Sequence, residues 1–99
     1  MPLDPKHIDD LFHLIASIDS PAEAKMLLKD LLTPKEVESL AERWQEIQLL
    51  ATGATQRDVA KKLGISISKV TRGARMLQYG SGGFAYFLKK LKKPVKMKV

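Results

Sequence analysis

The chain of 99 residues contains no cysteine, which excludes disulfide bonds and metal sites built on thiolates. It also lacks an apolar run long enough to cross a membrane. Its first ten residues, MPLDPKHIDD, carry charges and prolines where a secretory signal peptide needs an apolar segment. We therefore expect a soluble, cytoplasmic protein with no membrane partner.

Acidic residues are almost missing from the second half of the sequence. Residues 55–99 hold twelve Lys and Arg against one acid, Asp58, a balance of +11, whereas residues 1–54 hold five against ten, a balance of −5. This division suggests that the second half faces a polyanion such as nucleic acid. A lysine-rich surface that serves only solubility is the alternative.

The alternation of apolar and polar residues that is typical of strands is also missing. Instead, apolar residues recur at intervals of three and four, which indicates amphipathic helices. Ser20-Pro21 and Thr33-Pro34 each combine a capping side chain with a proline at the first helical position, so each predicts a helix start. Gly53 predicts the end of the helix that follows Thr33. The fold class is predicted to be all-α, with about six helices.

We expect one domain, residues 1–99, divided into four parts. The basic tail is interrupted by Pro94 and is expected to fray or remain disordered. The parts are a helical dimerisation core at about 8–52, a helix-turn-helix at about 55–78, a C-terminal helix at about 84–92 and the basic tail at 93–99.

The stretch TQRDVAKKLGISISKVTRG, residues 55–73, meets the steric demands of a helix-turn-helix. Ala60 is small enough for two helices to approach, and Gly64 can adopt the left-handed turn conformation. Thr55 and Ser66 can cap the two helices. An ordinary helical hairpin with a glycine turn is the alternative. The side chains expected to hold the pair together from beneath are Val59, Leu63, Ile65, Ile67 and Val70.

Polar side chains at the start of the first of these helices and along the second are donors suited to phosphates and base edges. Together with the basic half, they predict binding to double-stranded DNA. Binding of an acidic protein or RNA is the alternative, whereas the short apolar faces are needed for the core rather than for a membrane surface. The residues expected at or near DNA are Gln56, Arg57, Ser66, Ser68, Lys69, Thr71 and Arg75.

With LLTPKEVESLAERW, TQRDVAKKLG and KVTRG in order, the chain resembles the tryptophan repressor family over roughly residues 8–92. The resemblance implies an intertwined, all-helical homodimer that binds a palindromic operator. It also implies L-tryptophan as corepressor, bound between the helical core and the helix-turn-helix. Arg57 is then the expected reader of a guanine edge.

The resemblance also implies a set of ligand-binding residues. Arg72 would pair with the carboxylate of the amino acid, and Arg43 would lie across the indole. Thr33 would hydrogen-bond the carboxylate, and backbone carbonyls near Leu32 of the partner subunit would accept from the ammonium. Gly73 would leave room for the ring.

The sequence departs from the family at Met76, which stands where a serine helps to hold the ammonium of the ligand. A different small-molecule effector, or none, therefore stays open as the alternative to tryptophan. Alanine and arginine at positions 74 and 75, and the stretch 80–83, are further departures.

Other chemistry has little support in the sequence. It offers no pairing of a nucleophile with a base and no phosphate-cradling loop, so we expect no enzyme activity and no cofactor besides the corepressor. His7 and His13 have no clear ligand partners for a metal site. Trp44 is expected in the core. The acids of the long helix are expected to form a solvated face: Glu36, Glu38, Glu42 and Glu46.

Overall fold

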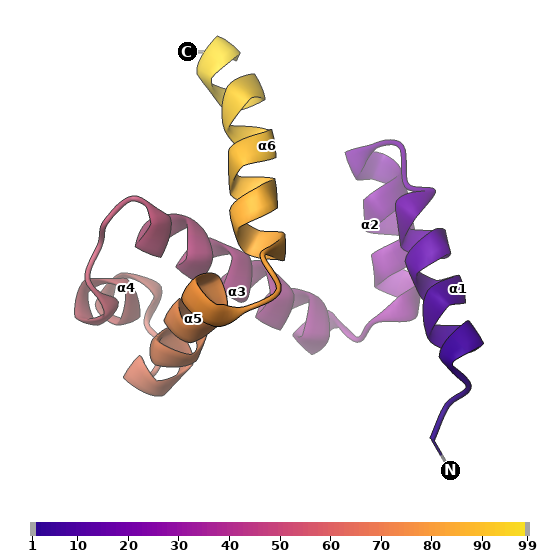
Figure 1. Ribbon diagram of the computed structural model, residues 1–99, viewed down its shortest axis with the longest axis horizontal. Coiled ribbons are helices and arrows are strands. Elements are labelled where there is room, and N and C mark those ends of the chain that lie inside the picture. Colours follow the sequence, from indigo (N-terminus) through magenta and orange to yellow (C-terminus); the bar gives the residue numbers. More distant parts are fainter. Residues whose placement is uncertain (1, 99) are drawn as a thin grey trace. The chain divides into compact units, whose positions relative to one another are not determined.

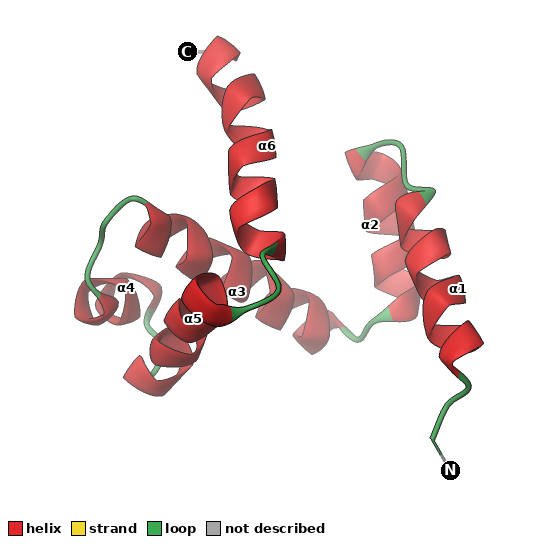
Figure 2. Ribbon diagram, in the orientation of Figure 1, coloured by secondary structure: helices red, strands yellow, loops and turns green. Residues whose placement is uncertain are grey.

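The computed structural model describes the backbone of residues 2–98 and the side chains of residues 2–91. Over this range the chain forms six helices and no strand (Figure 1), which confirms the all-α prediction. Figure 2 shows that short loops join the helices. The helices are α1 (Pro5–Ala16), α2 (Pro21–Leu31), α3 (Pro34–Ala51), α4 (Gln56–Leu63), α5 (Ile67–Tyr79) and α6 (Gly83–Lys98).

The predicted helix starts are confirmed by their hydrogen bonds. Thr33 and Glu36 form a reciprocal cap: the Glu36 amide donates to Thr33 Oγ1 at 3.1 Å, and the Thr33 amide donates to Glu36 Oε1 at 2.8 Å. The bond from the Thr33 amide, with a smaller contribution from the Thr33 side chain, holds the pKa of the Glu36 carboxyl below its usual value. At the start of α2, the Glu23 amide donates to Ser20 Oγ at 3.1 Å. Gly53, at φ +96°, lies just beyond the end of α3 as expected.

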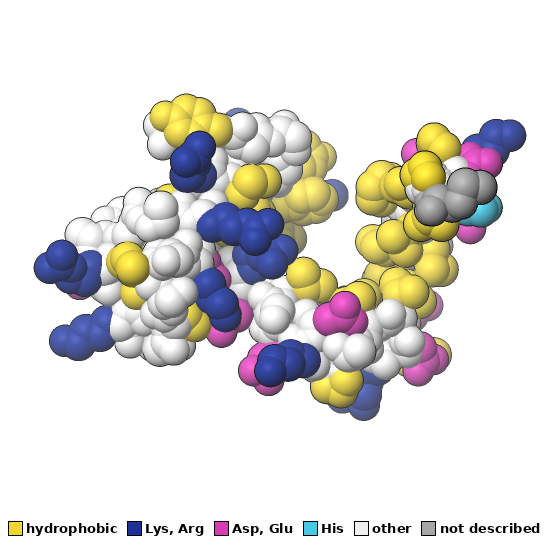
Figure 3. Space-filling model, turned by 90° about the horizontal axis from the view of Figure 1, so that it is seen from below, with side chains coloured by type: hydrophobic (Ala, Val, Ile, Leu, Met, Phe, Trp, Pro, Cys, Tyr) yellow, Lys and Arg dark blue, Asp and Glu magenta, His cyan; other side chains and the backbone are white. Residues whose placement is uncertain are grey.

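The chain divides into two compact units, Met1–Val37 and Glu38–Val99. In the first unit, α1 and α2 contain no fully buried residue. Figure 3 shows apolar side chains, in yellow, spread over these two helices. Two helices alone cannot remove so much apolar surface from water. The large apolar side chains of this unit that remain exposed are Leu3, Ile8, Leu11, Phe12, Leu14, Ile15, Met26 and Leu31.

The second unit has a core of three fully buried apolar side chains, Ile47, Val59 and Val70. They come from α3, α4 and α5, so the predicted helix-turn-helix packs on the long helix. Ile67 was expected beneath the helix pair, but half of it is exposed. Its position as the first residue of α5, before that helix meets its neighbours, explains the difference.

Polar caps and a glycine turn fix the helix-turn-helix. Thr55 Oγ1 accepts from the Asp58 amide at 3.1 Å, and Ser66 Oγ accepts from the Lys69 amide at 3.2 Å. Gly64 ends α4 in the left-handed conformation, at φ +67° and ψ +36°. Both predicted caps and the predicted turn are therefore confirmed.

The last helix is longer than the sequence indicated. α6 continues to Lys98, whereas Pro94 led us to expect a helix end near residue 92. A proline can kink a helix without ending it, because only one backbone hydrogen bond is lost. The side chains of residues 92–99 lie outside the described residues. Among the described helices, none combines the length and apolar character needed to cross a membrane.

We predict that Gly64→Ala destabilises the protein by about 1 kcal/mol, because an L-residue is strained in the left-handed conformation. Nothing lies within 4 Å of a Cβ built on Gly64, so the cost is one of backbone conformation alone. Chemical denaturation at a fixed protein concentration measures it. Gly83→Ala is the control, since Gly83 is the first residue of α6, has no positive φ and would meet only Ser81 Oγ, at 4.0 Å. Equal stability of the two variants would contradict the role of Gly64.

Candidate nucleic-acid interface and ligand pocket

The predicted DNA-facing residues are exposed around the helix-turn-helix. Gln56 and Arg57 form the first turn of α4, and most of the others lie on α5. Thr71 Oγ1 donates to Gln56 Oε1 at 2.8 Å, which ties the start of α4 to the exposed side of α5. Because this bond uses the amide oxygen, the amide nitrogen of Gln56 can still donate to DNA.

Lys69 lies on the exposed face of α5 and also contacts α3. Its Nζ donates to Glu42 Oε1 on α3 at 3.2 Å. The Lys69 side chain is 60% exposed and that of Glu42 is 28% exposed, so this ion pair contributes little to stability. It does place the lysine at the edge of a polar cavity between the two helices.

This polar cavity, of about 240 Å³, brings together four predicted ligand residues: Arg43, Arg72, Gly73 and Met76. They come from α3 and α5 and are separated by about thirty positions in the sequence. Leu32 and Thr33, the other two, belong to the first unit, where Leu32 caps the end of α2. The remaining lining residues of the cavity are Ser39, Glu42, Glu46, Lys69 and Phe84.

Glu46 is the residue of the cavity that the sequence prediction missed. It was expected on a solvated helix face, but it is only 4% exposed, so that prediction is wrong. The reason is that α5 packs over this part of α3, at Gly73. A Cβ added to Gly73 would lie 3.0 Å from Glu46 Oε1 and 3.8 Å from Ile47 Cδ1. The missing side chain at position 73 therefore makes the space that the Glu46 carboxylate occupies.

The surroundings of Glu46 disfavour its charged form. Burial raises the pKa of its carboxyl, and repulsion from Glu42 adds to the increase. The positive charges of Arg43 and Lys69 act in the opposite direction and do not cancel it. Among the described side chains, none donates a hydrogen bond to the Glu46 carboxylate. The sequence carries only an indirect signal of this arrangement: Gly73 lies inside a predicted helix, where a glycine can mark a close contact with another element.

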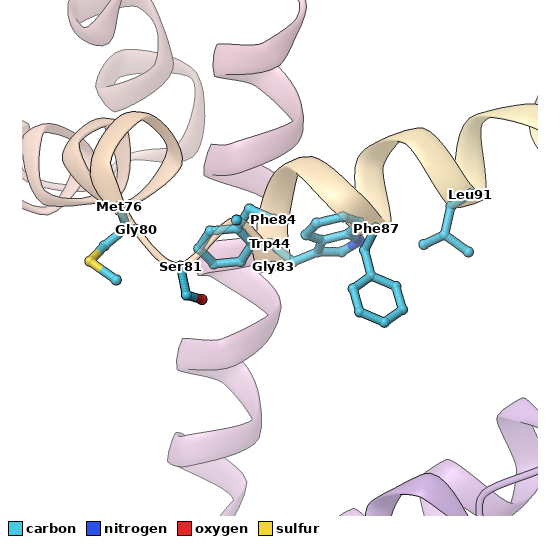
Figure 4. Close-up of a pocket in the computed structure, with 9 residues that line it drawn as sticks. Trp44, Met76, Gly80, Ser81, Gly83, Phe84, Phe87 and Leu91 are labelled. Atoms are coloured by element: carbon cyan, nitrogen blue, oxygen red, sulfur yellow. The ribbon is translucent and has the colours of Figure 1, made fainter.

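An apolar cavity of about 490 Å³ shares Met76 and Phe84 with the polar one. Figure 4 shows Trp44 beside Phe84, with Phe87 and Leu91 further along α6. The Trp44 and Phe84 rings stack with their centroids 6.4 Å apart and their planes 24° apart. Trp44 was expected in the core, but it is only half-buried and lines this cavity. The second unit thus offers a charged cavity next to an apolar one, which suits a small molecule with a polar head and an apolar body.

Known proteins resemble this chain over most of its length. A Trp operon repressor homolog of Xylella fastidiosa (strain M23) is 44% identical over 69 residues, which are 69% of this chain and 75% of that protein. The uncharacterized protein YerC of Bacillus subtilis (strain 168) is 31% identical over 87 residues, 88% of this chain and 84% of that one. The crystal structure of a TrpR-like protein from Eubacterium eligens matches with a TM-score of 0.83 and 30% identity, and covers 88% of this chain and 90% of that one.

The family model described as Trp repressor protein matches residues 6–92, which contain all the described elements of the candidate site. With its helix-turn-helix, its cavity between α3 and α5 and this match, the chain belongs to the Trp repressor family, a family of DNA-binding transcriptional regulators.

Proposed function

We propose that this protein is a sequence-specific transcriptional repressor that binds its operator as a homodimer and takes L-tryptophan as corepressor. The observation that carries the proposal is the position of the polar cavity. One wall of it is α5, the second helix of the helix-turn-helix, and this wall includes Arg72 and Gly73. A ligand bound there touches the helix that would enter the major groove. Genes of tryptophan metabolism are the natural targets of such a repressor.

The charges and exposed donors support recognition of duplex DNA. Residues 55–99 carry a balance of +11, which favours any polyanion. Specificity needs more, namely side chains that reach base edges from a fixed position. Arg57 is exposed in the first turn of α4, next to Gln56, whose side chain is held by Thr71. A guanidinium in such a place can bind the O6 and N7 atoms of guanine together.

The residues of the polar cavity support an amino acid with an aromatic side chain. Arg72 can bind a carboxylate through two parallel hydrogen bonds, and Arg43 can stack on an aromatic ring. Gly73 lines the cavity from α5 and has no side chain to fill it. The stacked pair of Trp44 and Phe84 shows that flat aromatic surfaces already gather beside the cavity.

The apolar surface of the first unit supports the homodimer. A second copy of the chain would cover the exposed side chains of α1 and α2, among them Phe12 and Leu31. A dimer with twofold symmetry also presents two reading heads to the two halves of a palindromic operator. In such a dimer, the backbone near Leu32 of the partner subunit would complete the ligand site.

A regulator with the same fold and a different effector is the second candidate. The polar cavity contains charges of both signs, from Arg43, Arg72 and Lys69 and from Glu42 and Glu46. Met76 adds no hydrogen-bonding group comparable to a hydroxyl. These side chains favour a ligand that is itself charged at two points, and tryptophan is one member of that class.

We predict that Arg57→Ala weakens operator binding by roughly 1–3 kcal/mol and relaxes the preference at one base pair. Selection of binding sites from a randomised duplex library, with wild type and variant in parallel, measures both effects. Lys89→Ala is the control, because it removes the same charge from an exposed site on α6, outside the helix-turn-helix. It should leave the base preferences as they are. If Arg57→Ala selects the same bases as wild type, Arg57 does not recognise a base.

We predict that Arg72→Ala lowers the affinity for L-tryptophan by about tenfold or more, because a charge-assisted pair with the carboxylate is lost. Thermal unfolding should change little, since Arg72 is exposed. Isothermal titration of the purified protein measures the affinity. Arg75→Ala is the control on the same helix, since Arg75 is exposed and does not line the cavity. Wild-type affinity in Arg72→Ala would show that the ligand binds elsewhere, and failure of the variant to fold would show that Arg72 supports the fold rather than ligand binding.

A further inference from the structure

Glu46 is in an unusual position for a carboxylate. It is 4% exposed, it lines the polar cavity, and no described side chain donates a hydrogen bond to it. Burying a charge without a partner costs free energy that the rest of the fold must offset. An apolar or amide side chain at position 46 would fill the space over Gly73 without this cost. The carboxylate therefore calls for a reason beyond packing.

The charged groups around Glu46 do not provide a partner for it. On its own helix, α3, Glu42 repels it and Arg43 attracts it. From α5, Lys69 attracts it, but the Lys69 ammonium bonds to Glu42 at 3.2 Å. Arg72 also lines the cavity from α5, and the contribution of α6 is the ring of Phe84. The oxygens of Glu46 thus border the cavity, and no described protein group donates a hydrogen bond to them.

We propose that Glu46 determines the specificity of the cavity: its carboxylate binds the ammonium group of the ligand, so that the protein selects an amino acid over the corresponding simple acid. This inference rests on the proposed function of the cavity and adds the residue that recognises the amino group. Arg72 and Glu46 then bind the two opposite charges of one zwitterion. Met76 has no polar group for this task, and Glu46 supplies it from the facing helix.

Gly73 fits the same arrangement. A Cβ at this position would come within 3.0 Å of Glu46 Oε1, which is closer than real Cβ atoms normally approach an oxygen. A larger residue at position 73 would therefore push the carboxylate into the space that a ligand needs. Gly73 and Glu46 therefore belong to one site: the glycine leaves the space in which the carboxylate lies at the edge of the cavity.

The test compares wild type with Glu46→Gln, which keeps the shape of the side chain and removes its charge. Glu38→Gln is the matched control, because Glu38 is exposed on the same helix and does not line the cavity. Each protein is titrated calorimetrically with L-tryptophan and with indole-3-propionate, which lacks the ammonium. The binding of each protein to the operator duplex obtained by selection is also measured, at one fixed salt concentration.

We expect wild type and Glu38→Gln to prefer L-tryptophan by about tenfold to a hundredfold, the usual value of a charge-assisted bond. Glu46→Gln should bind the two molecules within about threefold of each other. It should fold at least as stably as wild type, since it buries no charge. Carbon NMR of the Glu46 carboxyl adds a direct signature: its raised pKa should fall when L-tryptophan binds, because an ammonium stabilises the ionised form.

The outcomes separate this inference from the function on which it rests. If L-tryptophan binds and strengthens operator binding, but Glu46→Gln keeps the full preference for the amino acid, then Glu46 has no part in recognition and only this inference fails. The same conclusion follows if wild type shows no preference. If no protein binds L-tryptophan while the operator is still bound, the corepressor and this inference both fail, and DNA binding stands. If the wild type binds no duplex sequence specifically, the proposed function itself is wrong.

Discussion

The close approach of α3 and α5 at Gly73 is the contact on which the rest of the second unit depends. Gly73 is buried, and a Cβ there would meet a carboxylate oxygen on one side and the buried Ile47 on the other. A Cβ at this position would force the Glu46 side chain to shift by a few tenths of an ångström. The contact fixes α5 on the long helix, and the polar cavity opens between the same two helices. One packing constraint therefore positions both the helix proposed to read DNA and one wall of the proposed ligand site.

This arrangement gives a physical route for coupling between ligand and operator. A ligand that bridges Arg43 on α3 and Arg72 on α5 changes the free energy of every displacement between these helices. By thermodynamic linkage, the factor by which such a ligand changes operator affinity equals the factor by which the operator changes ligand affinity. The ion pair between Glu42 and Lys69 spans the same two helices, but it is exposed enough to break at little cost.

Much of the fold could be predicted from the sequence because local signals determine it. Thr33, Thr55 and Ser66 cap helices as predicted, and Gly64 adopts the left-handed turn, since each effect depends on a few neighbouring residues. The grouping of Arg43 with Arg72 followed from the family resemblance, and the cavity brings the two together. Spacing along either helix alone did not reveal it.

Contacts between elements were harder to predict. Glu46 belongs to a row of acids on α3 that reads as a solvated face, and nothing within that helix shows that Gly73 covers its fourth member. Ile67 has the right residue type for the core but lies at the very start of α5, where the neighbouring helices do not reach. α6 is longer than predicted, because Pro94 indicates a helix end in the sequence but lies within the helix in the structure.

The acidic, apolar first unit and the basic second unit also give a physical reason for the proposal that a single chain is an incomplete regulator. The first unit has helices with apolar faces and no buried residue, so its stability depends on what covers those faces. In the proposed homodimer, that cover is the other chain, and one of the six predicted ligand residues, Leu32, then belongs to it. Ligand binding would stabilise the dimer by mass action, because the complete pocket exists only there. The proposed role of Glu46 fits this logic: an ammonium in the assembled site would offset the cost of the buried carboxylate, and ligand binding would then favour the dimer.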